Sequence, residues 1–427
     1  MATDSIRTKR FWRLALSLGA ALAVGLAFGA PARSAAEVPH YEMIFEARII
    51  PTQRIARASW TVGVGAKALR ELNLHIDPER HFEFEGDGEI TVEDDIVTWK
   101  PPVAGGTLRY GFRVDDIRKG GGYDARITDN WALFRGDDLF PPASARTLRD
   151  AHSVSVLRLN TPQGWSVATP YPQSGPHTYE VHDPHRRFDR PTGWMVVGEL
   201  GVLRETVAGT RLAIAGPVGH GVRRHDMLAF MRWHLPKLRD VVGKLPDRLL
   251  IVSAGDPMWR GGLSGPASVF LHADRKMITA DASSPILHEL FHSTSRLTGG
   301  ADGDWIVEGL AEYYSLEVMA RSRTLSRSRH ARALERLARN GRGTQLAGRN
   351  SSGAATARAA AVLHDLDAHI REGTDDAHNL DDVVNLIARQ PRTITTAMFR
   401  RFAERATGLE LGAYFEREIL PILDAED

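Results

Sequence analysis

Hydrophobic and polar residues alternate along the first half of the chain, which is the pattern of half-buried β-strands. From about residue 38 to 215 the apolar positions recur with a period of two, and clusters of Gly and Pro separate the runs. Clear examples of alternation lie at residues 60–64, 82–84, 90–92 and 108–114. Because short strands joined by tight turns give this pattern, we expect an antiparallel β-sandwich or a pair of small sheets.

The period changes to that of helices near residues 216–221. Residues 223–243 carry apolar side chains at helical spacing, whereas residues 249–252 have the uninterrupted apolar character of a buried strand. From residue 283 onward the pattern is mostly helical, and a stretch rich in Gly, Ser, Arg and Asn at 341–355 interrupts it. Further helical runs follow near residues 357–372, 380–389, 394–406 and 411–418.

Capping residues mark the starts of two of these helices. Ser284 is suited to the N-cap, and Pro285 follows in the first helical position, where its missing N–H costs nothing. Asp304 can cap a second helix over residues 305–322. These two helices follow closely in the sequence, so we expect them to be neighbours in the fold.

The patterns together predict an α+β chain of several domains. We expect an antiparallel β-rich N-terminal domain over residues 37–216, an α/β domain over 217–340 and a C-terminal α-helical domain over 341–427. A chain of 427 residues is long enough for two or three such domains, each with its own core.

Residues 1–36 are predicted to be an export signal rather than part of the fold. Basic residues between Arg7 and Arg13 precede an uncharged run over 14–30, and small residues follow at 34–36. We therefore expect an exported protein, periplasmic or extracellular. The alternative is an uncleaved N-terminal membrane anchor, because the apolar run is near the shortest length that spans a bilayer.

Composition removes several kinds of site. The chain has no Cys, so disulfides, thiolate zinc sites, iron–sulfur clusters and cysteine nucleophiles are excluded, and any metal must be held by His, Asp or Glu. The formal net charge is +1, from 54 basic and 53 acidic residues. The whole chain therefore lacks the excess of basic residues that is typical of nucleic-acid-binding proteins, and we expect no nucleic-acid partner.

The most informative segment is HELFH, at residues 288–292. On a helix, His288 and His292 share one face, so both imidazoles can bind a single cation. Glu289 lies beside them, where it can take a proton from metal-bound water. The alternative is a pair of partly exposed helix histidines beside a surface Glu.

A second acidic motif, WIVEGLAEYY, follows at residues 305–314. Glu308 supplies the third ligand that a site with two His needs for one zinc ion, with the fourth position left for water. Glu312 lies one helical turn later, and it can hold the far N–H of a ligand His or be a solvated helix residue. A purely structural zinc is disfavoured, because closed sites mostly use Cys.

HELFH followed by WIVEGLAEYY resembles the gluzincin metallopeptidases, and among them the glycyl aminopeptidase family, which is related to aminopeptidase N. The resemblance implies a thermolysin-like α/β catalytic domain, and we expect no PDZ domain in this chain. It also implies that His288, His292 and Glu308 bind zinc. Glu289 would be the general base when zinc-activated water hydrolyses a peptide or protein substrate.

The resemblance extends upstream to an edge strand that is implied to bind the substrate. Gly262 and Leu263 match that strand, but Ser264 stands where the family has the Glu that grips a free substrate amine. We therefore leave strict aminopeptidase specificity open. The cleft is expected between the His helix and the strand near residues 258–272.

A second departure concerns the group that donates to the tetrahedral oxyanion. Thr356 stands where the family has a Tyr, and no Tyr occurs between Tyr314 and Tyr414. Candidates to replace it are Arg358, His364 or a side chain from the β-rich half. Losing an oxyanion donor typically costs about 10²–10³ in rate.

We therefore expect an exported zinc metallopeptidase, with aminopeptidase activity as one option. The alternative is a catalytically weak, metal-binding relative that acts as an envelope peptide-binding or scaffold protein. Hydrolysis of a non-peptide substrate by the same zinc site is a third reading. A second metal site at His182, Asp183 and His185 is less favoured, because a loop with Pro carries these residues.

Overall fold

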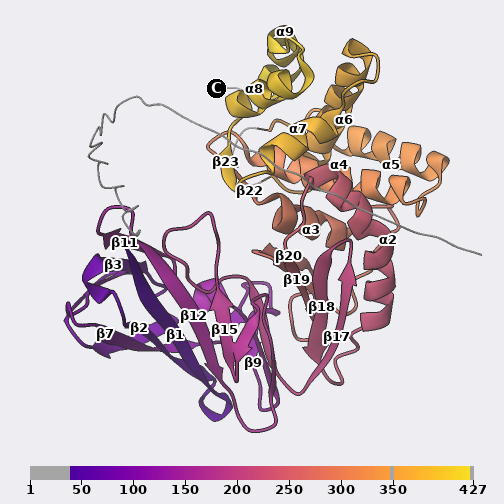
Figure 1. Ribbon diagram of the computed structural model, residues 1–427. Coiled ribbons are helices and arrows are strands. Elements are labelled where there is room, and N and C mark those ends of the chain that lie inside the picture. The colour runs from indigo at the N-terminus through magenta and orange to yellow at the C-terminus, as the bar shows by residue number, and fades with distance from the viewer. Residues whose placement is uncertain (1–38, 347–350, 424–427) are drawn as a thin grey trace, which may run out of the picture. The chain divides into compact units, whose positions relative to one another are not determined.

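The computed structural model describes residues 39–346 and 351–423. The predicted export signal over residues 1–36 lies outside the described residues, so it stays a prediction (Figure 1). Within the described ranges, none of the helices combines the length and the hydropathy that crossing a bilayer requires.

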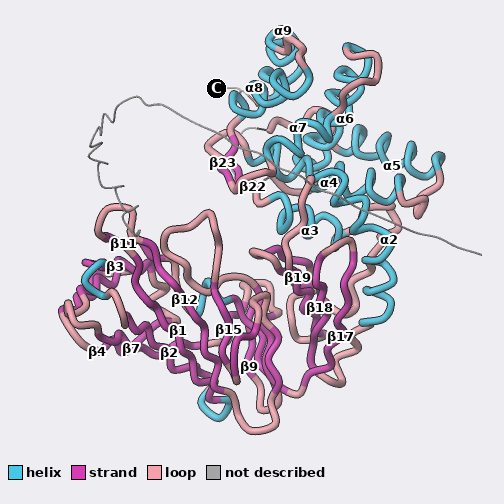
Figure 2. The backbone as a smooth tube through the Cα atoms, viewed as in Figure 1, coloured by secondary structure: helices cyan, strands magenta, loops and turns pink. Residues whose placement is uncertain are grey.

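Three sheets make up the β-rich half, as the alternating pattern predicted (Figure 2). A seven-stranded sheet has the order β14 (Gln173–Gly175), β15 (Thr178–Val181), β12 (His152–Asn160), β1 (His40–Ile50), β2 (Ile55–Val62), β7 (Gly106–Arg113) and β4 (His81–Gly86). A five-stranded sheet has the order β13 (Ser166–Ala168), β16 (Trp194–Gly198), β10 (Trp131–Arg135), β9 (Tyr123–Ile127) and β8 (Asp116–Ile117). A four-stranded sheet has the order β11 (Ala143–Thr147), β3 (Leu69–His75), β6 (Ile96–Lys100) and β5 (Glu89–Glu93).

The pairing in these sheets is antiparallel with one exception. Strand β1 runs parallel to β12, with His40 opposite His152 and Arg48 opposite Asn160. The sequence pattern predicted only antiparallel sheets, so this pair corrects that expectation. Period-two alternation marks which residues face the core, but it carries no information on the direction of a partner that lies far along the chain.

A fourth, mixed sheet carries the edge that matters for the site. Its order is β17 (Leu200–Val207), β18 (Thr210–Pro217), β19 (Arg248–Ala254), β21 (Ser268–His272) and β20 (Gly262–Gly265). Strands β18, β19 and β21 are parallel, and β20 pairs antiparallel with β21 at the edge. Strands β17 and β18 share this sheet with β19, although the predicted domain boundary at residue 216 placed them in the N-terminal part. The three-domain division stays a prediction.

Helices dominate the chain after this sheet (Figure 2). The long ones are α2 (Arg224–Val242), α3 (Pro285–Ser295), α4 (Asp304–Arg321), α5 (Arg327–Asn340), α6 (Ala354–Gly373), α7 (Leu380–Ile387) and α8 (Thr396–Thr407). Short helices are α1 (Gly136–Leu139) and α9 (Gly412–Tyr414), and a two-stranded sheet pairs β22 (Leu297–Gly299) with β23 (Arg392–Ile394). The predicted mixture of sheets and helices is therefore confirmed.

The two faces of the mixed sheet pack against different partners. Successive strand side chains point to opposite faces. Leu249 and Ile251 of β19 accordingly join the helical core, whereas Leu250 and Val252 pack with Trp194 of the β-rich half. Both faces of the sheet are therefore buried. Its edge strand β20 borders the cleft described below.

Candidate metal centre and cleft

Helix α3 begins and ends at defined signals. Ser284 is the N-cap and accepts a hydrogen bond from the Leu287 N–H, with Pro285 in the first position, as the sequence predicted. Leu290 and Phe291 are buried in the helical core, whereas the two histidines are only partly buried. The helix thus turns its polar face, with His288, Glu289 and His292, toward the cleft.

Helix α4 lies against α3 and presents the second motif. The rings of Phe291 and Tyr314 stack with centroids 5.5 Å apart, which joins the two helices directly above the site. On the other side, a Cβ at Gly309 would come within 2.8 Å of Ala359, so only glycine permits this close packing of α4 on α6. The expected cap at Asp304 is wrong. Gly303 precedes the helix and Asp304 is its first residue.

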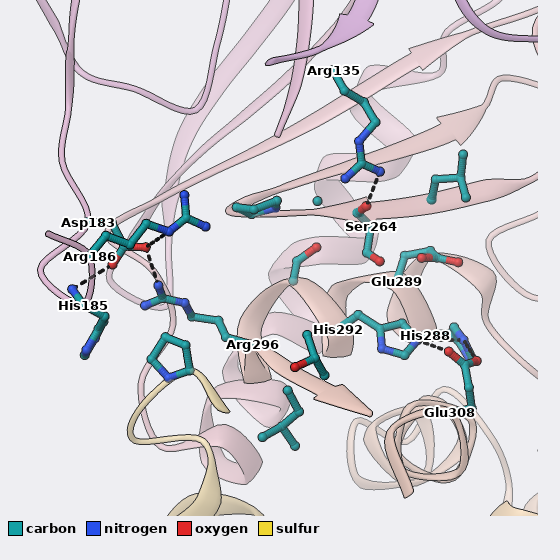
Figure 3. A pocket seen from close by; sticks show the side chains of 17 residues that line it. Arg135, Asp183, His185, Arg186, Ser264, His288, Glu289, His292, Arg296 and Glu308 are labelled. Atoms are coloured by element: carbon teal, nitrogen blue, oxygen red, sulfur yellow. Dashed lines mark hydrogen bonds and ion pairs between the residues drawn. The ribbon is translucent and has the colours of Figure 1, made fainter. Parts of the chain in front are cut away.

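Three donor atoms converge between α3 and α4 (Figure 3). The Nε2 atoms of His288 and His292 lie 3.1 Å apart. The Glu308 carboxylate lies 3.3 Å from His288 Nε2 and 3.4 Å from His292 Nε2. All three ligand atoms fall within 4.8 Å of one another. Two imidazoles and one carboxylate are a donor set that zinc takes in open sites, so the residues present fit a zinc ion.

Glu312 holds the outer nitrogen of one of these histidines. Its Oε2 lies 3.3 Å from His288 Nδ1, in position to accept the N–H. The side chain of Glu312 is only 18% exposed, so the solvated alternative does not describe it. A carboxylate on the far nitrogen fixes the tautomer and the orientation of the ring, so that Nε2 is presented to the metal position.

The two histidines have opposite pKa shifts. Burial alone lowers the pKa of His288, but hydrogen bonds to Glu308 and Glu312 outweigh it and raise that pKa to about 10. Burial, together with the positive charge of His288, lowers the pKa of His292 to about 4. Near neutral pH these pKa values give the pair one positive charge, on His288, whose ring lies between two carboxylates.

Glu289 sits beside the donors in a different environment. Burial raises its pKa, and the negative charge of Glu308 adds to the rise, whereas the charge of His288 and hydrogen bonding with Ser264 oppose it. A carboxylate with a raised pKa is a better proton acceptor near neutral pH. Gly262 permits this placement, because a Cβ there would lie 3.1 Å from Glu289 Cγ.

A cleft of about 720 Å³ opens beside the donors, between α3 and the edge strand β20. This is where the sequence predicted it. Leu263 and Ser264 line it, whereas Gly262, also expected at the substrate, is not among its lining residues and lies next to Glu289. In the described residues, β20 pairs only with β21, and its Leu263 and Ser264 carbonyls accept from Trp194 Nε1 and Arg135 Nη1, at 2.9 and 3.2 Å. An extended chain along this edge would share these acceptors.

Several lining residues were missed by the sequence analysis. Arg135 from the end of β10 reaches over the edge strand, where its Nη1 donates to the Ser264 carbonyl at 3.2 Å. At the other end, Asp183 accepts from Arg296 Nη2 at 2.7 Å and lies 3.5 Å from Arg186 Nε (Figure 3). These contacts join segments more than 100 residues apart in the chain, and no local motif encodes them.

The less favoured second metal site is not assembled. Asp183 is engaged by arginines, and His182 lies instead beside Asp189, with His182 Nδ1 3.4 Å from the carboxylate. Among residues 39–346 and 351–423, the group of metal-ligating side chains that converge is the one at His288, His292 and Glu308.

Two of the candidate oxyanion donors also lie elsewhere. Thr356 lines a separate cavity of about 540 Å³, which it shares with Glu312. His364 lies with its ring 6.0 Å from that of Tyr313 on the core side of α4, and Arg358 packs against Gly341. Of the alternatives, only the β-rich half contributes side chains to the cleft, namely Arg135, Asp183, His185 and Arg186. No tyrosine is among the described residues that line the cleft.

No protein-family model matches this chain, and no curated protein matches it by sequence. By structure, the chain is similar to an aminopeptidase N family protein from Idiomarina loihiensis, with a TM-score of 0.67, 13% sequence identity, and coverage of 90% of this chain and 77% of that one. It is similar to an M1 zinc metallopeptidase from Deinococcus radiodurans, with a TM-score of 0.59, 17% identity, and coverage of 91% and 94%.

A mutant M1 zinc metallopeptidase from Deinococcus radiodurans, bound to a Tyr-Ser-Ala substrate, gives a TM-score of 0.61 at 16% identity and covers 91% of this chain and 95% of that one. These similarities extend over both the β-rich half and the helical half. The expected resemblance to the aminopeptidase N superfamily is therefore confirmed in the fold. The described chain has the fold of the M1 zinc metallopeptidases.

Proposed function

We propose that this chain is a zinc-dependent metallopeptidase of the gluzincin type. The observation that carries the proposal is the convergence of His288, His292 and Glu308 beside Glu289, in a cleft bordered by an open strand edge. The structurally similar proteins named above include M1 zinc metallopeptidases, one of them bound to a tripeptide substrate, and that supports the same reaction class.

Each residue has a distinct role in the proposed reaction. His288, His292 and Glu308 hold the zinc ion, and Glu312 fixes the orientation of His288 through its Nδ1. When bound, zinc supplies Lewis acidity, which polarises a carbonyl oxygen and lowers the pKa of water. Glu289 accepts the proton of the water that attacks the scissile carbon and then donates it to the leaving amine.

The substrate backbone is proposed to lie along β20. An extended peptide that adds to the strand edge would hydrogen-bond with the backbone of Leu263 and Ser264 and would bring one carbonyl over the metal position. Ser264 offers no carboxylate to a free amine, so the proposal leaves the choice between aminopeptidase and endopeptidase open. We also propose an exported, periplasmic or extracellular location, supported by the predicted signal over residues 1–36.

A second candidate is an envelope protein that binds metal and peptides but hydrolyses them weakly. Thr356 favours it, because it stands where the related enzymes have a Tyr and lies outside the cleft. Against it stands Glu289, which is buried beside the ligand set and has no structural ion pair of its own among the described residues.

The deciding experiment uses the zinc-loaded chain with a diverse peptide mixture, and the products are mapped by mass spectrometry. The metallopeptidase proposal predicts cleavage that disappears in Glu289→Gln, and the cut positions separate aminopeptidase from endopeptidase. If the wild type contains one zinc ion and gives no Glu289-dependent cleavage, the binding-protein candidate replaces the proposal.

A further inference from the structure

Two arginines line the end of the cleft away from the metal centre. Arg186 and Arg296 lie there with Asp183, whereas Arg135 lies over Ser264 (Figure 3). The carboxylates of Glu289 and Glu308 lie at the opposite end, with the histidines. The cleft therefore has one acidic, metal-binding end and one basic end.

Arg296 is placed by the same helix that carries the histidines. It follows His292 by four residues, so along the axis of α3 its backbone lies about 6 Å beyond His292. It ends the helix in the left-handed conformation, with φ of 57°, where glycine would be less strained. What this position offers instead of glycine is a guanidinium in the cleft, 36% exposed and within 2.7 Å of Asp183.

Asp183 does not neutralise both of its arginine partners. Its Oδ2 accepts from Arg296 and lies 3.5 Å from Arg186, so one carboxylate oxygen serves two guanidiniums. Its Oδ1 accepts the backbone N–H of His185. Arg186 is 37% exposed and lines the cleft. Within the described part of the chain, the two guanidiniums thus share one carboxylate, which leaves one positive charge uncompensated.

Arg135 differs, because Asp137 compensates it. The Asp137 carboxylate lies 2.8–2.9 Å from two nitrogens of the guanidinium, and another N–H goes to the Ser264 carbonyl. Arg135 therefore braces the edge strand, and the unneutralised charge lies with Arg186 and Arg296.

We propose that Arg186 and Arg296 bind a substrate carboxylate, so that the cleft takes acidic peptides. The inference rests on the proposed function and deepens it. Guanidinium groups bind carboxylates with charge-assisted hydrogen bonds, and Asp183 already accepts one such bond from Arg296 at this place. An extended chain rises about 3.4 Å per residue, so the carboxylate belongs one or two residues from the scissile bond.

The substrate carboxylate can have two sources, an acidic side chain or a free C-terminus. The probes are alanine-based hexapeptides that carry Glu or Gln at one position, each with a free or an amidated C-terminus. Steady-state KM is measured on the zinc-loaded enzyme, and Kd is measured by calorimetry on zinc-loaded Glu289→Gln. A preference for Glu over Gln assigns the side chain, whereas a preference for free acid over amide assigns the C-terminus.

Two variants that shift KM and Kd in opposite directions separate carboxylate recognition from a structural role of these residues. Arg296→Gln should raise KM and Kd for the carboxylate-bearing peptides about tenfold and change the neutral peptides little. Asp183→Asn removes the competing carboxylate, so it should lower both constants for the same peptides, by about threefold or more. Arg232→Gln, which loses an equivalent ion pair with Glu205 outside the cleft, is the matched control and should change neither.

The outcomes distinguish this inference from the proposed function. Cleavage with equal KM for acidic and neutral peptides, or a loss of binding in both Arg296→Gln and Asp183→Asn, overturns the carboxylate site and leaves the peptidase standing. Selective binding of acidic peptides without any cleavage supports the carboxylate site and overturns the peptidase. Failure to cleave or to bind any of the peptides overturns both.

Discussion

The two ends of the cleft are built in different ways. The metal end comes from two successive helices, within residues 288–312, and its side chains are two histidines and three carboxylates. The basic end is assembled from the loop at 183–186 and from Arg296, the residue that caps the C-terminus of α3. One end is a local motif, and the other is a product of tertiary folding.

The difference teaches which part of an active site carries chemistry and which part carries selection. Helical geometry fixes the spacing of His288 and His292, so the reactive end tolerates little variation in local structure. The basic end depends on where distant segments meet, so different chains with this fold can change it without altering the metal centre. The proposals therefore assign hydrolysis to one end and substrate choice to the other.

The largest expected effect comes from removing a nitrogen donor at the metal end. His292→Ala should weaken zinc binding more than the roughly 10–100-fold that is typical when a ligand's supporting residue is lost, and hydrolysis should disappear with the metal. Zinc content after dialysis against a chelator measures this effect. His364→Ala is the matched control, since His364 lies outside the cleft. Full zinc retention in His292→Ala would remove this residue from the ligand set.

The next largest effect should be a lower kcat with little change in zinc affinity. Glu289→Gln keeps the volume of the side chain but removes the proton acceptor, so kcat should fall by about 10²–10⁴. Zinc affinity should stay within a few-fold of the wild type, because Glu289 is not among the converging donors. A variant that retains wild-type kcat would show that another group acts as the base.

A smaller loss is expected at the residue that orients His288. Glu312→Gln replaces the carboxylate that faces His288 Nδ1, and zinc affinity should drop about 10–100-fold. A competition titration with a zinc-binding dye gives the value. Glu335→Gln on the exposed face of α5 serves as the control. If the two variants bind zinc equally well, Glu312 does not support the ligand.

The smallest effect is expected at Arg135, whose side chain donates to the backbone of the edge strand β20. Arg135→Gln removes the hydrogen bond to the Ser264 carbonyl and loosens β20, so KM should rise about two- to fivefold. The rise should be the same for Glu- and Gln-containing peptides, because Asp137 already neutralises this guanidinium. A rise confined to the acidic peptides would place Arg135 with Arg186 and Arg296 in recognition.

The sequence predicted that His288, His292 and Glu308 converge, because the information for this is local. The cap at Ser284 and the spacing of HELFH are properties of one helix, and a third ligand on the next helix follows from the short connection between them. The alternating pattern likewise predicted the β-rich half, since burial of one strand face requires a period of two.

What the sequence did not predict depends on partners far along the chain. Strand β1 pairs in parallel with β12, about a hundred residues later, and alternation carries no signal for that. Asp304 was expected to cap α4, but its side chain accepts the N–H of Ser351 instead. Arg186 and Arg296 of the basic end are 110 residues apart in sequence, and the tertiary contact of Arg296 with Asp183 brings them into one site.

The most direct test of the account measures kcat and KM separately for one Glu-containing peptide with the zinc-loaded wild type, Glu289→Gln and Arg296→Gln. The account predicts that Glu289→Gln lowers kcat with little change in KM, whereas Arg296→Gln raises KM about tenfold with little change in kcat. If both variants changed the same constant, or if the wild type left the peptide intact, the division of the cleft into a reactive end and a selecting end would be contradicted.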